Sequence, residues 1–306
     1  MDFRELSYLM AVAKFQNITK AAEALCISQP GLSKFLTGLE NELGLKLFER
    51  VDKKYLPTYA GKRYLDYAKN ILETKSNLDS ELADIIKRDF GALYIGIPNM
   101  RCTYMLPKIL PAFNKKYPNV KINILEGTSA MLDKKLLEGE IDITFYSKPP
   151  ELNAGLEYEK IAVEELLICV QKNHPIKKFS HDNPASSYKK IDLSILKNER
   201  LILLSPEQRT GQIARLYLKQ AGINLTNSLT INNMPAIIEL TEKGYGVSFI
   251  FDSHLRYQNP VPEIDCFSFG EPCVKSDFVA AFRKNYYLPK YARDFILCVK
   301  RLYAGV

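Results

Sequence analysis

The chain has 306 residues, of which 46% are hydrophobic and 25% charged, and its formal net charge is +7. This length suffices for two domains with separate cores, and the composition is that of a globular rather than a disordered protein. No apolar run approaches the roughly 20 residues that span a membrane, and no basic-then-apolar leader opens the chain, so we expect a cytoplasmic protein without a membrane partner.

Three stretches with the apolar spacing of helices follow one another near the N-terminus. Residues 2–15 place apolar side chains on one face and predict a supporting helix. Thr19 is expected to cap a second, short helix, because its side-chain oxygen can accept a free amide of the first turn. Ser28 is expected to cap a third helix, with Pro30 in its first turn, where no amide partner is needed. The short link between the last two helices predicts a helix-turn-helix.

The third helix separates apolar from polar side chains. The stripe expected to face inward consists of Leu32, Leu36, Leu39 and Leu43. The outward positions of the first turns hold small polar and cationic residues, namely Gln29, Ser33, Lys34 and Thr37. Such side chains suit base edges and phosphates when a helix enters a major groove. Periodicity alone leaves open an ordinary helical bundle whose polar residues are merely solvated.

The run from Thr19 to Arg50 resembles the DNA-binding region of LysR-type transcriptional regulators. The matching positions are Phe15, Ala21, Ala22, Leu25, Ser28, Gln29, Pro30, Leu32, Ser33, Leu39, Glu40, Leu43, Gly44, Leu47, Phe48, Arg50, Thr58 and Gly61. The resemblance implies a bacterial-type regulator that binds double-stranded DNA. Gly38 departs from the family's pattern, and a glycine there costs about 1 kcal/mol relative to alanine in a helix. The candidate DNA-binding residues are Thr19, Ser28, Gln29, Pro30, Ser33, Lys34, Thr37, Arg50 and Lys53.

Residues 49–58 carry lysines and a proline between short apolar residues, which predicts a wing beside the third helix. A long helix without proline is then expected up to residue 88, and its apolar positions alternate in spacings of four and three. This coiled-coil seam comprises Tyr64, Ala68, Ile71, Leu78, Leu82 and Ile85, with a single polar break at Lys75. It favours a homodimer, and the resemblance also implies a dimer or a homotetramer that presents paired DNA-reading heads. A helix packed on its own domain is the open alternative.

Beyond Gly91, short apolar runs alternate with helix-like stretches, a pattern typical of a mostly parallel sheet covered by helices. We expect strands at residues 93–97, 120–125, 141–146, 165–170, 200–204 and 247–251, and helices at 104–117, 129–138, 211–221, 235–243 and 289–302. The region is similar to the effector domain of LysR-type regulators, which implies an α/β fold of two lobes like that of periplasmic binding proteins.

The expected domain organisation has three parts. Residues 1–58 form a winged helix-turn-helix, and residues 59–89 form the linker helix. Residues 90–306 form the effector-binding domain, with lobe I at 90–162 and 268–306 and lobe II at 163–267. In this order the chain would cross between the lobes twice.

No nucleotide-binding or hydrolase motif follows a predicted strand, so we expect no catalytic residue, cofactor or metal site. The cysteines lack a C-x-x-C pair, and the histidines lack the paired spacing of metal ligands. Two alternatives to a ligand-controlled regulator stay open. One is an enzyme with Cys102 as nucleophile. The other is a redox sensor that uses Cys102, or a disulfide between Cys266 and Cys273.

A two-lobed α/β domain is expected to hold its ligand where strands end and helices begin, because helix N-termini present free amides there. The candidate effector-binding residues are Asn99, Met100, Arg101, Thr103, Thr128, Ser129, Tyr146, Ser205, Arg209 and Asn233. Arg101 and Arg209 favour an anionic small molecule such as a carboxylate, because a guanidinium matches carboxylate geometry. The alternative is that the polar residues are helix caps and the arginines are solvated.

Overall fold

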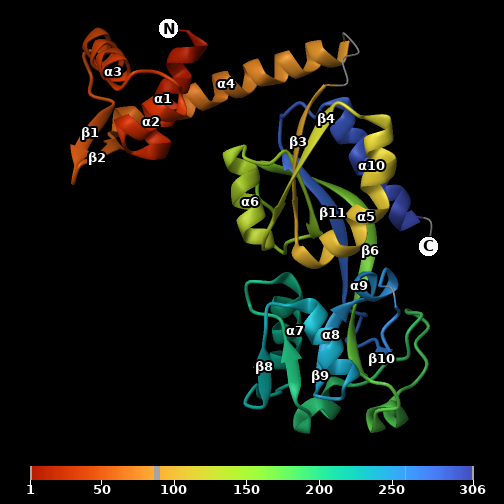
Figure 1. Ribbon diagram of the computed structural model, residues 1–306. Helices are drawn as coiled ribbons and strands as arrows, with labels where there is room; N and C mark the ends of the chain where they lie inside the picture. The colour runs from red at the N-terminus through yellow and green to blue at the C-terminus, as the bar shows by residue number, and fades with distance from the viewer. Residues whose placement is uncertain (1, 86–89, 259, 305–306) are drawn as a thin grey trace. The chain divides into compact units, whose positions relative to one another are not determined.

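The computed structural model of the chain describes residues 2–85, 90–258 and 260–304 (Figure 1). The chain divides into two compact units, Met1–Arg88 and Asp89–Val306. No helix within the described ranges is long and apolar enough to cross a bilayer.

The first unit consists of a helical head, a small hairpin and a long helix. Its elements are α1 (Phe3–Phe15), α2 (Ile18–Ala24), α3 (Gln29–Leu43), β1 (Phe48–Val51), β2 (Lys54–Pro57) and α4 (Tyr59–Ile85). Val12, Leu32 and Phe48 belong to one buried cluster that joins the helices to the hairpin. The predicted stripe of α3 is only partly right, because Leu43 is 39% exposed. It lies in the last helical turn, outside the buried cluster.

The second helix is capped by Asn17 and not by Thr19. Asn17 Oδ1 accepts hydrogen bonds from the amides of Thr19 at 2.9 Å and Lys20 at 3.1 Å. The predicted cap was therefore wrong, since Thr19 already lies inside α2. The start of α3 is confirmed: Ser28 Oγ accepts a hydrogen bond from the Gly31 amide at 3.2 Å, and Pro30 lies in the first turn.

The predicted wing is a tight antiparallel hairpin, with Val51 opposite Lys54. The two turn residues, Asp52 and Lys53, have φ values of 48° and 66°. Two successive positive φ values give the turn whose twist matches that of the flanking strands. Lys53 is thereby exposed at the tip of the wing.

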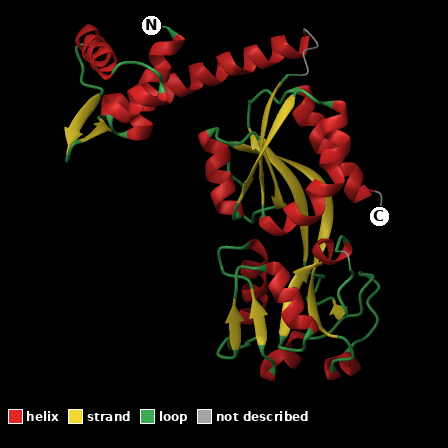
Figure 2. Cartoon of the chain, in the orientation of Figure 1, coloured by secondary structure: helices red, strands yellow, loops and turns green. Residues whose placement is uncertain are grey.

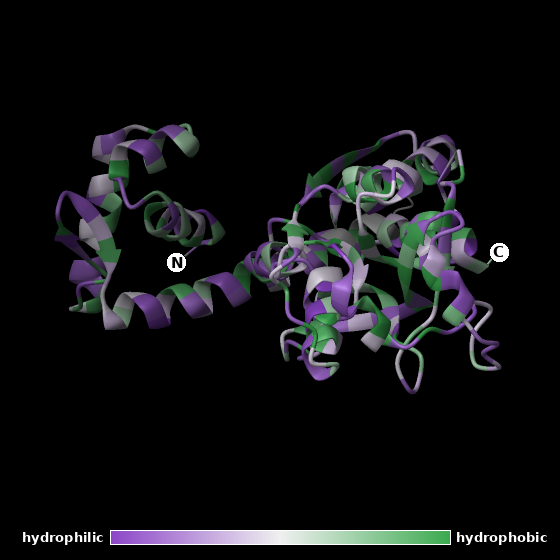
Figure 3. Ribbon diagram, turned by 90° about the horizontal axis from the view of Figure 1, so that it is seen from below, coloured by the Kyte–Doolittle hydropathy of each residue, from purple (hydrophilic) through white to green (hydrophobic). Residues whose placement is uncertain are grey.

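The seam of α4 is largely uncovered within the chain. Ala68 is buried, but Ile71, Leu78 and Leu82 are 37%, 54% and 46% exposed. Figure 3 shows hydrophobic and hydrophilic residues alternating along this helix. The Ile85 side chain lies outside the described side chains. The exposed apolar row favours a partner helix over packing within the chain.

The second unit is built on one mixed sheet in the order β4-β3-β5-β11-β6-β9-β7-β8, with β10 paired to β6. Its strands are β3 (Gly91–Ile97), β4 (Val120–Glu126), β5 (Ile143–Ser147), β6 (Leu156–Gln171), β7 (Leu201–Leu203), β8 (Ser228–Thr230), β9 (Val247–Phe251), β10 (Ile264–Phe267) and β11 (Lys275–Arg283). The two ends of the sheet are parallel, whereas every pairing of β6 and β11 is antiparallel. The expectation of a mostly parallel sheet is corrected accordingly.

The strand β6 joins two lobes. It pairs with β11 over residues 156–165 and with β9 from Leu166 onward. We call the part built on β3, β4 and β5 lobe I and the part built on β7, β8 and β9 lobe II. Helices lie on both sides of the strands in each lobe (Figure 2).

The helices of this unit are α5 (Asn99–Lys116), α6 (Ser129–Glu138), α7 (Arg209–Gln220), α8 (Met234–Glu242), α9 (Asp252–Arg256), α10 (Lys290–Ala304) and the short 3-10 helices η1 (Pro175–Phe179) and η2 (Leu193–Asn198). The helix α5 begins earlier than expected, because Pro98 occupies its N-cap position. The loop predicted before residue 104 is therefore the beginning of a helix.

Candidate functional site

One face of α3 forms an open polar groove. Its lining residues are Gln29, Pro30, Ser33, Lys34, Thr37, Gly38 and Asn41. The structure thus brings together the DNA-binding candidates predicted on this helix. Of the others, Ser28 caps α3, Thr19 lies on α2, Arg50 on β1 and Lys53 at the wing tip, and all four are exposed. Their contact with DNA stays a prediction.

A buried carboxylate fixes α3 against the hairpin. Glu40 accepts hydrogen bonds from the amides of Leu47 at 2.9 Å and Phe48 at 3.1 Å, and from Lys46 Nζ at 2.7 Å. Burial by itself raises the pKa of Glu40, but the bonds from Lys46, Phe48 and Leu47 outweigh burial and lower that pKa. Glu40 therefore fixes the position of the wing relative to the polar face of α3.

The second candidate site is a cavity of about 470 Å³ between lobes I and II. The first residues of four helices line it: Asn99 of α5, Ser129 of α6, Arg209 of α7 and Met234 of α8. A helix N-terminus presents amides without helical partners and the positive end of the helix dipole. The wall therefore suits a ligand with negative charge or several hydrogen-bond acceptors.

The cavity gathers every effector-binding candidate except Ser205. The candidates that line it are Asn99, Met100, Arg101, Thr103, Thr128, Ser129, Tyr146, Arg209 and Asn233. Ser205 is buried outside the lining, and its Oγ has no hydrogen-bond partner among the described residues.

Two of these residues are also helix caps, which is the role that the sequence analysis gave as the alternative to ligand binding. Thr128 Oγ1 accepts a hydrogen bond from the Met131 amide at 3.3 Å, and Asn233 Oδ1 accepts one from the Ala236 amide at 3.0 Å. Asn99 is not a cap, since Pro98 occupies that position. A role of these residues in ligand binding stays a prediction.

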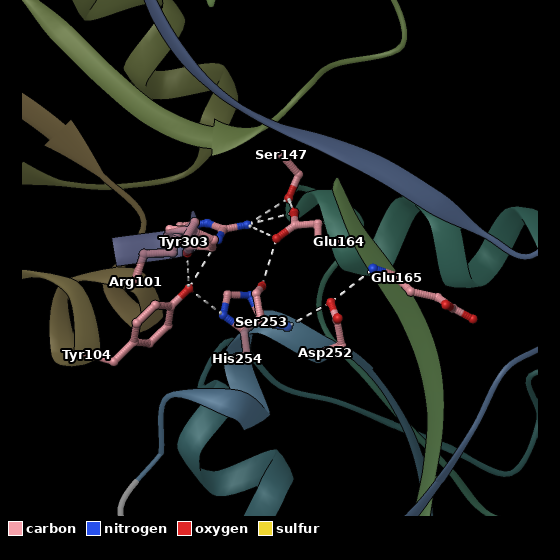
Figure 4. A network of polar contacts seen from close by, with 9 residues as sticks. All are labelled: Arg101, Tyr104, Ser147, Glu164, Glu165, Asp252, Ser253, His254 and Tyr303. Carbon is pink, nitrogen blue, oxygen red and sulfur yellow. Dashed lines mark hydrogen bonds and ion pairs between the residues drawn. The ribbon is translucent and has the colours of Figure 1, made fainter. Parts of the chain in front are cut away.

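Arg101 lines the cavity but offers no free charge to a ligand. Its Nη2 lies 2.8 Å from both carboxylate oxygens of Glu164, and the two side chains are only 2% and 1% exposed (Figure 4). Burial alone lowers the pKa of Arg101, but Glu164 raises it well above its ordinary value. The expectation that Arg101 holds an anion is corrected, because Glu164 already neutralises it.

The ion pair belongs to a larger buried network. Arg101 Nη1 donates to the hydroxyls of Tyr104 at 3.1 Å and Tyr303 at 3.2 Å. Ser253 of α9 donates to Glu164 at 2.7 Å, and Ser147 at the end of β5 also donates to it. The network thereby links elements of both lobes around β6 (Figure 4).

His254 adjoins this network and lines the cavity. Its Nδ1 lies 3.4 Å from the Tyr104 hydroxyl. Burial, and next the charge of Arg101, lower the pKa of His254 well below its ordinary value, so the imidazole is neutral. Glu164 and His254 were both missed by sequence reasoning. The one signal was an acidic pair, Glu164 and Glu165, at the start of a buried apolar run.

Arg209 is a charged residue of the cavity wall that forms no ion pair with another described residue. It is half-buried, its Nε is buried without a hydrogen bond, and its Nη1 lies 3.4 Å from Gln212 Oε1. No carboxylate of the described residues lies within 4.0 Å of it. Burial lowers the pKa of Arg209, but a guanidinium stays protonated in proteins.

Cys102 is poorly suited to the role that the thiol-based alternatives give it. Burial, with a smaller effect of Glu126, raises the pKa of Cys102 to about 12, which disfavours the thiolate that a nucleophile or sensor needs. Cys266 lies opposite Cys169 on the neighbouring strand, with the sulfurs 3.5 Å apart. The disulfide between Cys266 and Cys273 that the redox alternative considered is not formed, since all six cysteines are free. The described part of the chain also holds no cluster of residues suited to a metal ion.

Each of the two units matches a known protein family. Residues 3–62 match the family described as bacterial regulatory helix-turn-helix protein, lysR family. Residues 87–304 match the LysR substrate binding domain. The HTH-type transcriptional regulator CysB of Haemophilus influenzae is 32% identical over 299 residues, which cover 97% of this chain and 89% of that protein.

Solved structures show the same architecture. A full-length OxyR variant from Pseudomonas aeruginosa has a TM-score of 0.72 at 24% identity, over 98% of this chain and 95% of that one, which is a likeness of fold. Full-length CbnR complexed with its target DNA has a TM-score of 0.52 at 28% identity, over 98% of this chain and 99% of that one.

Proposed function

The chain belongs to the LysR family of DNA-binding transcriptional regulators with an effector-binding domain, and we propose that the α3 groove reads DNA while an anion in the interlobe cavity controls that binding. The families matched by both units, and the relative with 32% identity, are regulators and not enzymes. The enzyme alternative is therefore set aside.

The DNA-reading role rests on the exposed polar face of α3. Gln29, Ser33 and Lys34 share one open groove at the N-terminal half of the helix. Such side chains reach base edges when the helix lies in a major groove. Arg50 and Lys53 lie on the wing and suit phosphates, which position a protein on DNA without reading its sequence. The CbnR structure, in which that protein is complexed with its target DNA, supports this assignment.

We expect Gln29→Ala to lower discrimination between the preferred duplex and its single-base variants by about 1 to 3 kcal/mol, because a bidentate base contact is lost. Lys53→Ala should instead weaken all duplexes alike and reduce the salt slope of log K by about 1. Gel-shift titrations with a duplex that the wild-type chain enriches from a random-sequence pool measure both effects. If Gln29→Ala keeps full discrimination, Gln29 does not read a base.

The anionic character of the effector rests on Arg209. This guanidinium lies half-buried at the N-terminus of α7, where its Nε is buried without a hydrogen bond and its Nη1 faces only the uncharged Gln212 side chain. Asn99, Thr128 and Ser129 face the same cavity from lobe I and can donate further hydrogen bonds. Glu126 also belongs to the wall, but it is exposed. A small anion bound by Arg209 and by lobe I at once would hold the two lobes at one relative angle.

Assembly and domain limits are also part of the proposal. The exposed apolar row of α4 supports a homodimer, on which a homotetramer can be built. The limits at residues 58 and 89, and the lobe limits at 162 and 267, remain proposals. Because duplex DNA is the partner, we place the protein in the cytoplasm.

A further inference from the structure

His254 presents to the interlobe cavity a ring whose two nitrogens have different surroundings. The residue is 6% exposed and belongs to the cavity wall, where it lies on the short helix α9. Its Nδ1 lies 3.4 Å from the Tyr104 hydroxyl (Figure 4). Its Nε2 has no hydrogen-bond partner among the described residues, so Nε2 is the polar atom that this side chain leaves to the cavity.

The two tyrosines beside the ring determine which nitrogen carries the proton. Arg101 Nη1 donates to the hydroxyl oxygens of both Tyr104 and Tyr303, and these oxygens lie 3.0 Å apart. Each hydroxyl therefore has one proton left to donate. If Tyr104 donated to Tyr303, the buried Tyr303 hydroxyl would have no acceptor among the described residues, and an unpaired buried donor is costly. Tyr303 accordingly donates to Tyr104, and Tyr104 donates to His254 Nδ1.

This order of protons leaves the single proton of the neutral imidazole on Nε2. Every donor along the chain of hydrogen bonds from Arg101 to His254 then has an acceptor, except the Nε2 hydrogen that faces the cavity. The ring stays neutral because burial, and next the charge of Arg101, lower the pKa of His254 well below its ordinary value. The cavity wall thus holds an oriented, uncharged donor without a protein partner.

We infer that His254 binds the effector by donating a hydrogen bond from Nε2, and that the effector presents an acceptor oxygen to it. The inference deepens the proposed binding of an anion in this cavity and rests on it. Arg209 and the helix N-termini supply positive charge, whereas His254 adds a donor whose direction is fixed by buried side chains. An ammonium group at this point would set one donor against another. The effector class is therefore an anion whose oxygen, from a carboxylate or a carbonyl, reaches His254.

The proton on Nε2 is tested first, in the chain without ligand. The chain contains three histidines, so nitrogen-15 labelling of histidine gives a simple spectrum, and His254→Gln assigns the His254 signals by their loss. We expect a proton-bearing Nε2 and a bare Nδ1. A proton on Nδ1 instead would overturn the inference.

Binding is then tested by isothermal titration of the full chain with sulfate, acetate, succinate and citrate. Wild type is compared with His254→Gln, whose amide nitrogen can take the place of Nε2, and with His254→Asn, whose shorter side chain cannot reach that place. The matched control is His181→Asn, because His181 is exposed and lies outside the cavity wall. Chemical denaturation shows that each variant is folded.

We expect an anion that binds wild type to bind His254→Asn about tenfold or more weakly, because a hydrogen bond to a charged acceptor is lost. His254→Gln should recover much of this affinity, and His181→Asn should bind like wild type. The inference is wrong if His254→Asn binds like wild type, or if His254→Gln binds as weakly as His254→Asn, since a ring that only fills space would not distinguish the two.

Arg209→Gln, titrated alongside, separates this inference from the proposed function. If Arg209→Gln keeps full affinity while His254→Asn loses it, the proposed role of Arg209 fails and the donor role of His254 stands. A wild-type chain that binds none of the four anions would overturn both.

Discussion

Replacing Glu164 by glutamine is expected to destabilise the second unit by about 3 to 5 kcal/mol, the cost of leaving one member of a buried ion pair unpaired. Glutamine keeps the size of the side chain but removes its charge, so Arg101 would remain buried without a counter-ion. Both side chains are at most 2% exposed, so water cannot compensate. Chemical denaturation followed by circular dichroism measures the loss.

The matched control is Glu263→Gln, because Glu263 is 74% exposed and lies 3.8 Å from Lys172. Solvent-exposed ion pairs contribute little, so this variant should unfold like wild type. Replacing Arg101 and Glu164 together by Met and Leu should recover much of the stability, because no buried charge is left. If Glu164→Gln costs no more than Glu263→Gln, the pair does not hold the lobes together.

Leu78→Asp is expected to abolish dimerisation and to lower the affinity for the enriched duplex by about 10² to 10⁴-fold. The first effect follows because an unpaired carboxylate in an apolar seam is costly to bury. The second follows because linked DNA-reading heads bind with an avidity of this order, which separate heads lose. Sedimentation at low micromolar concentration and gel-shift titration measure the two effects.

Ser76→Asp introduces the same acid two residues away on α4, at an exposed position outside the seam. It should leave both dimerisation and DNA affinity close to those of wild type. A Leu78→Asp chain that still sediments as a dimer would show that the seam is not the contact between copies.

Features with local signals could be predicted from the sequence. The cap of Ser28, the wing and the long helix α4 depend on neighbouring residues, so their patterns were sufficient. Asn17 and Thr19 show where prediction from sequence ends, because both are good capping residues and they lie only two positions apart. The extended backbone of Asn17, with φ −146° and ψ 120°, decides between them, and this conformation has no signature in the sequence.

The cavity was predicted in outline because strands of one sheet end on the same edge, which brings separate loops together. The roles of the two arginines in its wall could not be predicted from the sequence. Arg101 and Arg209 look alike in sequence, but Arg101 meets Glu164, 63 residues away, and Arg209 meets no described carboxylate. The partner of a buried charge is set by tertiary packing, and for that reason Glu164 and His254 were missed.

The measurement that tests the proposed regulation most directly is isothermal titration of the full chain with sulfate, acetate, succinate and citrate. It compares wild type with Arg209→Gln and with Arg200→Gln, whose exposed guanidinium lies over the Tyr245 ring and not in the cavity. We expect at least one anion to bind wild type and Arg200→Gln alike. Arg209→Gln should bind it about tenfold or more weakly, since hydrogen bonds to charged groups contribute about 1.5 to 3 kcal/mol. An anion that binds wild type and Arg209→Gln with equal affinity would contradict an effector site built on Arg209.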